Sequence, residues 1–154
     1  MRILAIDYGK SRFGLAMSDE LHITANPLPT YERKNIKADI DYVVNLVLQN
    51  GAFKVVFGLP LNMNGSESEM SLQTREFATR LLKTYEQLKS EQLGEQSGGQ
   101  QNSLEIDFID ERLSSVQANK VLDKANVKGT KNKNKYVDAV VATLLLQTYL
   151  NYKV

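Results

Sequence analysis

The sequence contains no cysteine and only one histidine. Disulfide bonds and thiolate metal sites are therefore excluded, and a reducing compartment such as the cytoplasm is the expected location. A metal site in this chain has to be built mainly from carboxylates. Carboxylate oxygens favour hard ions such as Mg²⁺ or Mn²⁺ over zinc.

Long apolar runs are also absent, and no stretch approaches the length needed to cross a bilayer. Asp7 and Lys10 interrupt the apolar stretch at the amino terminus, so we expect neither a signal peptide nor a membrane anchor. The hydrophobic share of 42% is nevertheless enough for a core, and 154 residues fit one domain. We therefore expect residues 1–154 to form a single intracellular domain.

The net charge is only +1, but the positive charge is unevenly distributed. Between Asp123 and Asp138 the chain has no acid and five lysines, which are Lys124, Lys128, Lys131, Lys133 and Lys135. A local basic segment can attract phosphates even when the total charge is near zero. A merely solvated loop is the alternative interpretation.

Apolar periodicity and turn residues predict the order of the elements. Two strands joined by a tight turn favour an antiparallel hairpin, and Pro27 and Pro29 confine the third strand to an edge of the sheet. The predicted strands are residues 2–7, 13–18, 23–31, 52–58 and 104–109. The predicted helices run from 36 to a stop at Gly51, from a capping box at Ser66 to about 88, from Ser114 to about Lys124, and from about Asn134 to Tyr152.

A strand meander followed by alternating strands and helices predicts an α/β fold with a mixed five-stranded sheet and helices on both faces. Residues 90–103 interrupt this order with a composition dominated by Gln, Gly, Ser, Glu and Asn. Such a segment cannot bury enough apolar surface to order itself, so we expect a flexible loop inserted within the domain.

Acidic residues stand at three distant places where predicted elements begin or end. Asp7 closes the first strand, Asp110 and Glu111 close the last strand, and Asp138 lies one turn into the final helix beside apolar residues. The ends of central strands converge on one edge of an α/β sheet, so these acids could meet and bind one or two Mg²⁺ or Mn²⁺ ions. Ordinary turn, helix-end or ion-pair roles remain the alternatives, and strand alternation does not decide between Asp110 and Glu111.

Other residues near the same edge are candidates for phosphate contact. Gly9 permits close approach to the backbone, Lys10 and Arg12 follow it, and Asn62 lies in the loop after the central strand. Tyr8 flanks one of the candidate acids, and Tyr136 flanks another; each could stack on a base or pack at the rim of the core. Ordinary loop chemistry is the competing explanation for Gly9 and Asn62.

Four motifs in order resemble the YqgF family. They cover nearly the whole chain and are residues 5–19, residues 55–62 with Gly65 and Ser66, residues 110–115 with Ala118, and residues 135–142 with residues 146–150. The resemblance implies a ribonuclease-H-like fold related to Holliday junction resolvases. It also implies a hydrolase acting on ester bonds that trims the 5′ end of pre-16S rRNA in ribosome biogenesis, or resolves DNA junctions in recombination and repair.

By motif, the metal-binding and catalytic acids of that family fall on Asp7, Glu111 and Asp138, with Asp110 as the alternative to Glu111. Phe13 and the pair Ser114–Ser115 depart from the usual pattern, and neither departure touches the acids. The substrate contacts that we predict are Gly9, Lys10, Arg12, Asn62, Arg112, Lys131, Lys133 and Lys135.

Two further classes of function compete with a nuclease. The Asp7-x-Gly9 step also resembles a phosphate loop of actin-like and sugar-kinase ATPases, but 154 residues cannot supply their two domains. A nucleic-acid-binding module of the same fold without catalysis is the stronger alternative. The expected partners are pre-rRNA, or branched DNA as the alternative, together with the pre-30S ribosomal subunit; a monomer is favoured over a dimer because end trimming needs one active site.

Overall fold

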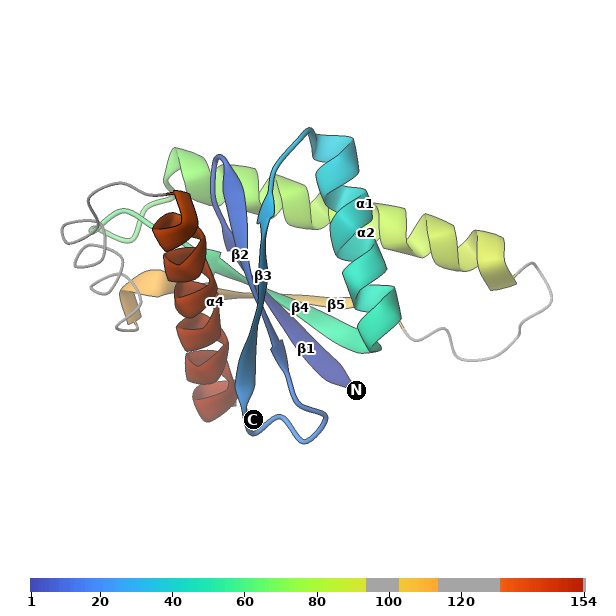
Figure 1. The fold of residues 1–154 in the computed structure, drawn as a ribbon. Helices are drawn as coiled ribbons and strands as arrows, with labels where there is room; N and C mark the ends of the chain where they lie inside the picture. The colour runs from blue at the N-terminus through green and yellow to red at the C-terminus, as the bar shows by residue number, and fades with distance from the viewer. Residues whose placement is uncertain (94–102, 114–130, 154) are drawn as a thin grey trace.

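The computed structural model describes residues 1–93, 103–113 and 131–153. Its centre is a five-stranded sheet in the order β3-β2-β1-β4-β5 (Figure 1). The strands are β1 (Arg2–Tyr8), β2 (Arg12–Ser18), β3 (Ala25–Glu32), β4 (Ala52–Leu59) and β5 (Glu105–Asp110). The helices are α1 (Ile36–Asn50), α2 (Glu69–Leu93), the 3₁₀ helix η1 (Glu111–Leu113) and α4 (Lys131–Lys153).

The sheet is mixed, as the sequence predicts. β1 pairs antiparallel with β2, which pairs antiparallel with β3, whereas β1–β4 and β4–β5 are parallel. β1 is therefore the central strand, and its carboxyl end lies beside the carboxyl end of β4 and the start of β2.

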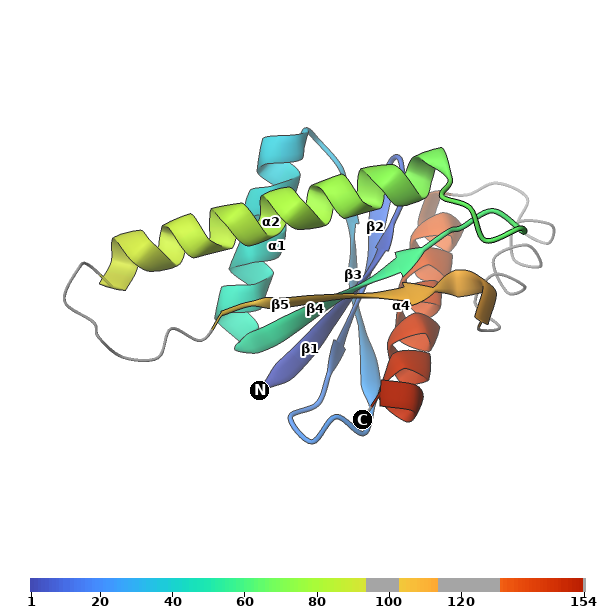
Figure 2. The same ribbon diagram turned by 180° about the vertical axis from the view of Figure 1, so that it is seen from behind.

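Helices cover both faces of the sheet, which confirms the predicted architecture. Figure 1 looks onto the β3 edge, with α4 on one side and α1 and α2 on the other, and Figure 2 shows the same layers from behind. Leu4 and Ile6 of β1 belong to the core under α1 and α2, whereas Ile3 and Ala5 pack under α4. Because side chains alternate along a strand, Asp7 faces α4 and Tyr8 faces α1 and α2.

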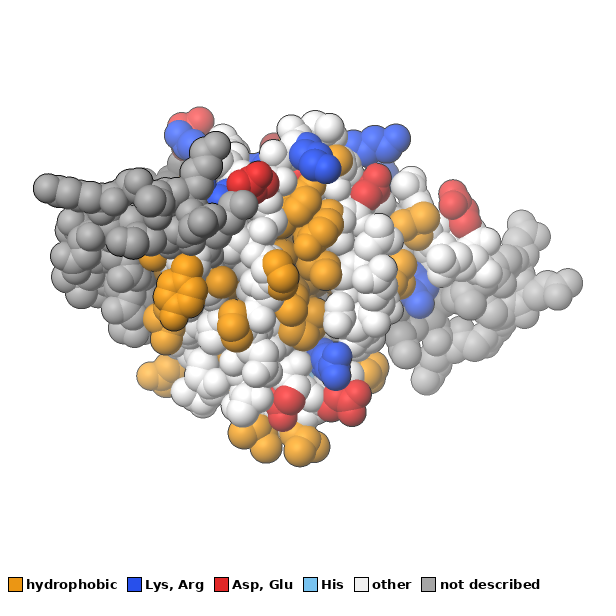
Figure 3. All heavy atoms as spheres, viewed as in Figure 1, with side chains coloured by type: hydrophobic (Ala, Val, Ile, Leu, Met, Phe, Trp, Pro, Cys, Tyr) orange, Lys and Arg blue, Asp and Glu red, His pale blue; other side chains and the backbone are white. Residues whose placement is uncertain are grey.

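The edge position of β3 agrees with its sequence. Pro27 and Pro29 cannot donate backbone hydrogen bonds, which restricts this strand to the border of the sheet. Figure 3 shows a band of apolar side chains between α4 and α1. Figure 1, drawn from the same side, shows that β3 runs through this band. The strand starts at Ala25 rather than at the predicted residue 23, because the Asp19 carboxylate accepts hydrogen bonds from the backbone of Ile23 and Thr24.

The helix α1 has the ends that its sequence predicts. The Asn35 side chain accepts a hydrogen bond of 2.9 Å from the backbone N–H of Ala38 at the first turn. Gly51 adopts φ +64° at the other end, in the left-handed region that favours glycine, and its N–H donates to the carbonyl of Val47.

Two predictions about α2 were wrong. The cap is Ser68, not Ser66, because the hydroxyl of Ser68 accepts from the backbone N–H of Ser71 at 3.0 Å. The helix also continues through Ser90 to Leu93, into the predicted loop. Within this added turn the Ser90 hydroxyl donates to the carbonyl of Glu86 one turn earlier.

The start of the last helix was also misplaced. α4 begins at Lys131 rather than near Asn134, so Lys131 and Lys133 belong to a helix and not to the predicted basic loop. Lysine is a good helix former, which explains why the helix extends into this segment. The rest of the 90–103 insert up to residue 102 and the helix predicted after Ser114 lie outside the described residues. Among the described helices, none is both long and apolar enough to span a membrane.

Candidate active site

Asp7 lies at the centre of the candidate site because two glycines flank it. It pairs directly with Gly14 of β2, and the pairing of Ile6 with Phe57 places Gly58 of β4 on its other side. Asp7 is only 6% exposed, so its carboxylate is held below the surface of the protein. Each glycine leaves an open position on the sheet next to this buried acid.

Glu111 occupies the position above Gly58. A Cβ atom at Gly58 would lie 2.6 Å from Oε1 of Glu111 and would also collide with Leu145 of α4. Glu111 is the first residue of η1 and is 3% exposed. The end of β5 therefore turns this carboxylate inward, toward the strand pair that carries Asp7.

Asp138 stands over the other glycine. A Cβ atom at Gly14 would collide with the backbone oxygen of Asp138, so the lack of a side chain at Gly14 allows α4 to approach β2 closely. The helix brings Asp138 beside the strand position that pairs with Asp7. The three predicted acids are thus gathered around the carboxyl end of β1.

The carboxylate of Asp138 forms an ion pair with Arg12. Arg12 Nε lies 2.8 Å from Asp138 Oδ2, and the two side chains are 28% and 25% exposed. Within the described residues, no group of three or more His, Cys, Asp or Glu side chains is arranged so that it could hold a metal ion. In this conformation the carboxylate of Asp138 pairs with Arg12 and is not part of a metal-binding group of described residues.

Asp110 has a different partner from Glu111. Its two carboxylate oxygens accept from Arg112, with Nη2–Oδ2 at 2.7 Å and Nε–Oδ1 at 3.1 Å, and the backbone N–H of Arg112 also donates to it. These hydrogen bonds lower the pKa of Asp110 and raise that of Arg112. Asp110 thus fixes the guanidinium of Arg112, which also donates to the carbonyl of Met63 at 3.3 Å and lies against Gly65.

The predicted substrate contacts at the turn and in the loop have structural roles of their own. Gly9 closes the turn between β1 and β2, where its N–H donates to the carbonyl of Arg12, and Lys10 in this turn is exposed. Asn62 organises its loop by donating to the hydroxyl of Ser66 and to the carbonyl of Glu67. The turn and the loop both lie at the end of the sheet that carries the acids.

The predicted basic contacts are only partly described. Lys131, Lys133 and Lys135 fall in the first turns of α4, and their side chains lie outside the described part of the chain, as do Lys124 and Lys128. Tyr8 is 6% exposed and belongs to the core, whereas Tyr136 is 73% exposed.

Sequence reasoning missed the packing role of the two strand glycines, and it missed Arg33. A glycine inside an apolar strand often marks a close approach by another segment, and Gly14 and Gly58 carry that signal. Arg33 offers no such local signal. Its Nη1 donates to the carbonyl of Gly9 at 3.0 Å, so it supports the turn from the opposite face of the sheet.

The sequence matches one family model and several named proteins over nearly its whole length. A family model described as "RuvX: Holliday junction resolvase" matches residues 1–152. A protein of Syntrophomonas wolfei named "Putative pre-16S rRNA nuclease" is 37% identical over 98% of this chain and 94% of its own length. A protein of Bacteroides fragilis with the same name is 33% identical over 99% of this chain and 97% of its own length.

Solved structures support the fold. RuvC of T. thermophilus, in a complex with a Holliday junction substrate, matches with a TM-score of 0.56 over 99% of this chain and 97% of that chain. A second structure of Thermus thermophilus RuvC matches with a TM-score of 0.51. The sequence identity is 10% in both cases, so these matches establish a shared ribonuclease-H-like fold only.

Proposed function

The chain belongs to the RuvX/YqgF family, and from that membership we propose that it is a metal-dependent nuclease that processes the 5′ end of pre-16S rRNA. The observation that carries the proposal is the packing of acids on strand glycines. Glu111 lies over Gly58, and Asp138 lies over Gly14, on the two strands that flank Asp7. The glycines at these two positions allow the segments that carry Asp138 and Glu111 to approach the strands beside Asp7.

Asp7, Glu111 and Asp138 supply carboxylate oxygens, the donor type that hard divalent cations prefer. Asp7 and Glu111 are carboxylates at 6% and 3% exposure at the carboxyl ends of β1 and β5. We assign them as ligands of Mg²⁺ or Mn²⁺, with Asp138 as the third ligand once Arg12 releases it. Such an ion, when bound, supplies an activated water and stabilises charge on the phosphate oxygens.

Of the two neighbouring acids Asp110 and Glu111, we assign Glu111 as the metal ligand. Asp110 already holds Arg112 in a two-pronged pair, and that arrangement suits an arginine that is to be presented to a phosphate. Asp110 is thus assigned as a positioning residue for Arg112. Arg12 is assigned a similar task, because a substrate phosphate can replace Asp138 as its partner.

The other proposed phosphate contacts are Gly9, Lys10, Asn62, Lys131, Lys133 and Lys135. The enzyme would act as a cytoplasmic monomer on the pre-30S subunit, since trimming one end needs one active site. The relatives from Syntrophomonas wolfei and Bacteroides fragilis carry the pre-16S rRNA name, and this name supports RNA as the substrate.

The test is cleavage of two labelled substrates by the purified protein with Mg²⁺ or Mn²⁺. One is a 5′-extended 16S rRNA precursor, and the other is a four-way DNA junction, which the description of the family model favours. The proposal predicts that the RNA is cleaved, that Asp7→Asn abolishes this cleavage, and that Asp41→Asn keeps it. Asp41 serves as the control because it lies at an exposed position on α1. Paired cuts in the junction alone would replace the proposal with a resolvase that works as a dimer.

A further inference from the structure

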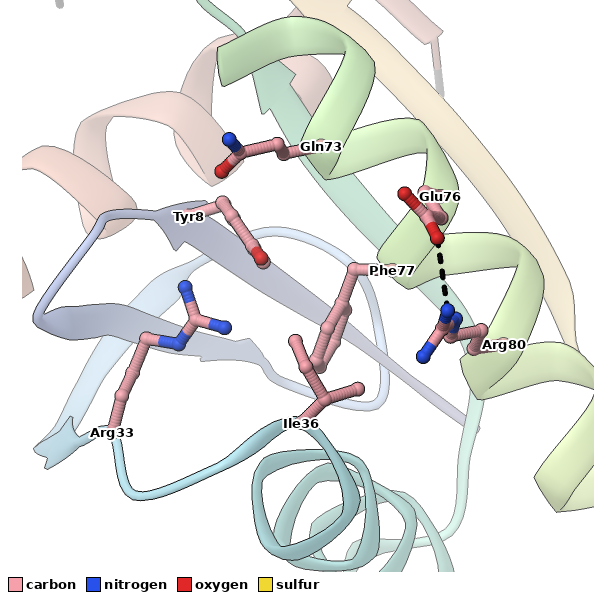
Figure 4. A pocket seen from close by; sticks show the side chains of 7 residues that line it. All are labelled: Tyr8, Arg33, Ile36, Gln73, Glu76, Phe77 and Arg80. Atoms are coloured by element: carbon pink, nitrogen blue, oxygen red, sulfur yellow. Dashed lines mark hydrogen bonds and ion pairs between the residues drawn. The ribbon is translucent and has the colours of Figure 1, made fainter. Parts of the chain in front are cut away.

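A pocket of about 330 Å³ lies on the face of the sheet opposite the acids. Figure 4 shows its walls: Tyr8 comes from β1, Arg33 from the segment before α1, and Gln73, Phe77 and Arg80 from α2. The lining combines two aromatic residues, the side chain of Ile36, two guanidinium groups, the amide of Gln73 and the carboxylate of Glu76, which pairs with Arg80. Groups of this kind bind nucleotides in proteins, because guanidinium planes stack on bases and pair with phosphates while amides bind base edges.

One wall of the pocket is rigid. The guanidinium of Arg33 lies 4.7 Å from the ring centroid of Tyr8 and 4.9 Å from that of Phe13, and its Nε is 3.0 Å from the buried carboxylate of Asp39. Tyr8 and Phe77 are in ring contact with a centroid distance of 5.3 Å. These groups are fixed before any ligand arrives, which lowers the entropic cost of binding.

The opposite wall can adapt. Gln73 and Arg80 stand on exposed positions of α2, and Arg80 forms only a surface ion pair with Glu76, 3.0 Å apart. Exposed pairs of this kind are weak, so Arg80 can exchange Glu76 for a phosphate. In Figure 4 the Tyr8 hydroxyl points into the space between the two walls.

The pocket lies at the same strand end as the proposed active site, on the other face of the sheet. Asp7 and Tyr8 are neighbours in β1 whose side chains leave opposite faces of the same strand end. The turn at Gly9 lies between the two sites, and Arg33 holds its carbonyl at 3.0 Å. A single strand that passes over this turn can reach both sites at once.

We propose that this pocket binds one unpaired nucleotide of a single-stranded segment, close to the phosphodiester that is held at the acids. The base lies over the Tyr8 hydroxyl with its polar edge toward Gln73, and Arg80 takes the adjacent phosphate; the buried rings of Tyr8 and Phe77, at 6% and 2% exposure, form the floor of the pocket. This inference rests on the proposed nuclease function for the identity of the ligand, but binding at the pocket does not depend on cleavage.

Binding of a short fluorescent single strand, as RNA and as DNA, tests the pocket in EDTA with the Asp7→Asn protein. The test variant is Gln73→Ala with Arg80→Ala. The matched control is Gln87→Ala with Lys83→Ala, which removes one amide and one cation from exposed positions of the same helix outside the pocket. The pocket variant is expected to bind about tenfold more weakly, and the control to stay close to the parent.

A series of strands, each lacking one base at a different position, then locates the nucleotide that occupies the pocket. One abasic position should weaken binding to the parent protein and have little further effect on the pocket variant. Equal affinities of pocket and control variants, or equal losses at every abasic position in both, would overturn the inference. A strand that binds through the pocket but is not cleaved by the unsubstituted protein with Mg²⁺ or Mn²⁺ would reject the nuclease proposal alone. A larger ratio of affinities between control and pocket variants for RNA or for DNA identifies the natural strand.

Discussion

At the scale of single residues, the site depends on the absence of two side chains. Gly14 and Gly58 keep the strand surface open where Asp138 and Glu111 approach it. The close approach of α4 at Gly14 involves backbone, which cannot rotate away as a flexible side chain can. Substitution at this position should therefore displace the helix and the acid that it carries.

Gly14→Ala is expected to reduce stability by about 1–3 kcal/mol, the usual cost of overpacking, and to reduce cleavage more than the lower stability explains. Urea unfolding and cleavage of the same preparation measure the two effects. Gly51→Ala is the control: its left-handed backbone at φ +64° should cost about 1–2 kcal/mol, but its added methyl meets nothing within 4 Å. Cleavage by folded Gly51→Ala should be normal; an equal reduction in both variants would contradict this role of Gly14.

At the scale of elements, a buried cluster ties β3 to the start of α1. Asp39 accepts a hydrogen bond of 2.9 Å from the hydroxyl of Tyr31 and pairs with Arg33. Burial, followed by the hydrogen bond to Asp39, raises the pKa of Tyr31 from 10.0 to about 12. The folded state thus favours the protonated phenol.

This shift has a defined effect on stability. In the unfolded chain the phenol loses its proton near pH 10, whereas in the folded chain it does so near pH 12. The contribution of Tyr31 is complete below pH 10 and is lost as the pH rises from 10 to 12. Tyr31→Phe should flatten the decline in unfolding free energy over that window, measured by urea titration, whereas Tyr152→Phe at an exposed position should not; identical pH profiles would reject this role.

The same elements show what could be predicted from the sequence. Strand alternation, the prolines of β3 and the stop at Gly51 are local signals, and they predict the correct sheet and α1. The predicted cap of α2 was wrong by two residues, because Ser66 and Ser68 both suit a cap and only the path of the loop after β4 selects Ser68.

The site was predicted less completely, because its contacts join distant parts of the chain. Arg12 and Asp138 are 126 positions apart, and no local pattern shows that they pair. Alternation could not separate Asp110 from Glu111, since the turn into η1 breaks the period of the strand. The pairing of Asp110, by contrast, is among the ion-pair roles that the sequence suggests, because Arg112 is only two residues away.

At the scale of the whole molecule, the net charge is only +1, so electrostatic binding of nucleic acid depends on local basic segments. Lys131, Lys133 and Lys135 lie in the first turns of α4, less than two turns before Asp138. Replacing these three and Lys128 by alanine should reduce the salt dependence of binding. The expected reduction in the logarithmic slope is about 0.7 for each phosphate of a single strand that the variant no longer neutralises.

Fluorescence titrations at several salt concentrations measure that slope. The charge-matched control replaces Lys34, Lys37, Lys83 and Lys89 by alanine, which removes four positive charges from other parts of the molecule. An unchanged slope in the α4 variant, or the same change in both variants, would show that the lysines before Asp138 do not bind phosphates.

The proposed active site requires that Asp7, Glu111 and Asp138 act together on one kind of ion. Calorimetric titration of Mn²⁺ into the folded protein tests this directly, with Asp7→Asn, Glu111→Gln and Asp138→Asn beside Asp41→Asn. We predict that each of the first three weakens Mn²⁺ binding by about tenfold or more, while Asp41→Asn binds as the parent does. Equal Mn²⁺ affinity in all four variants and the parent would contradict the assignment of the site.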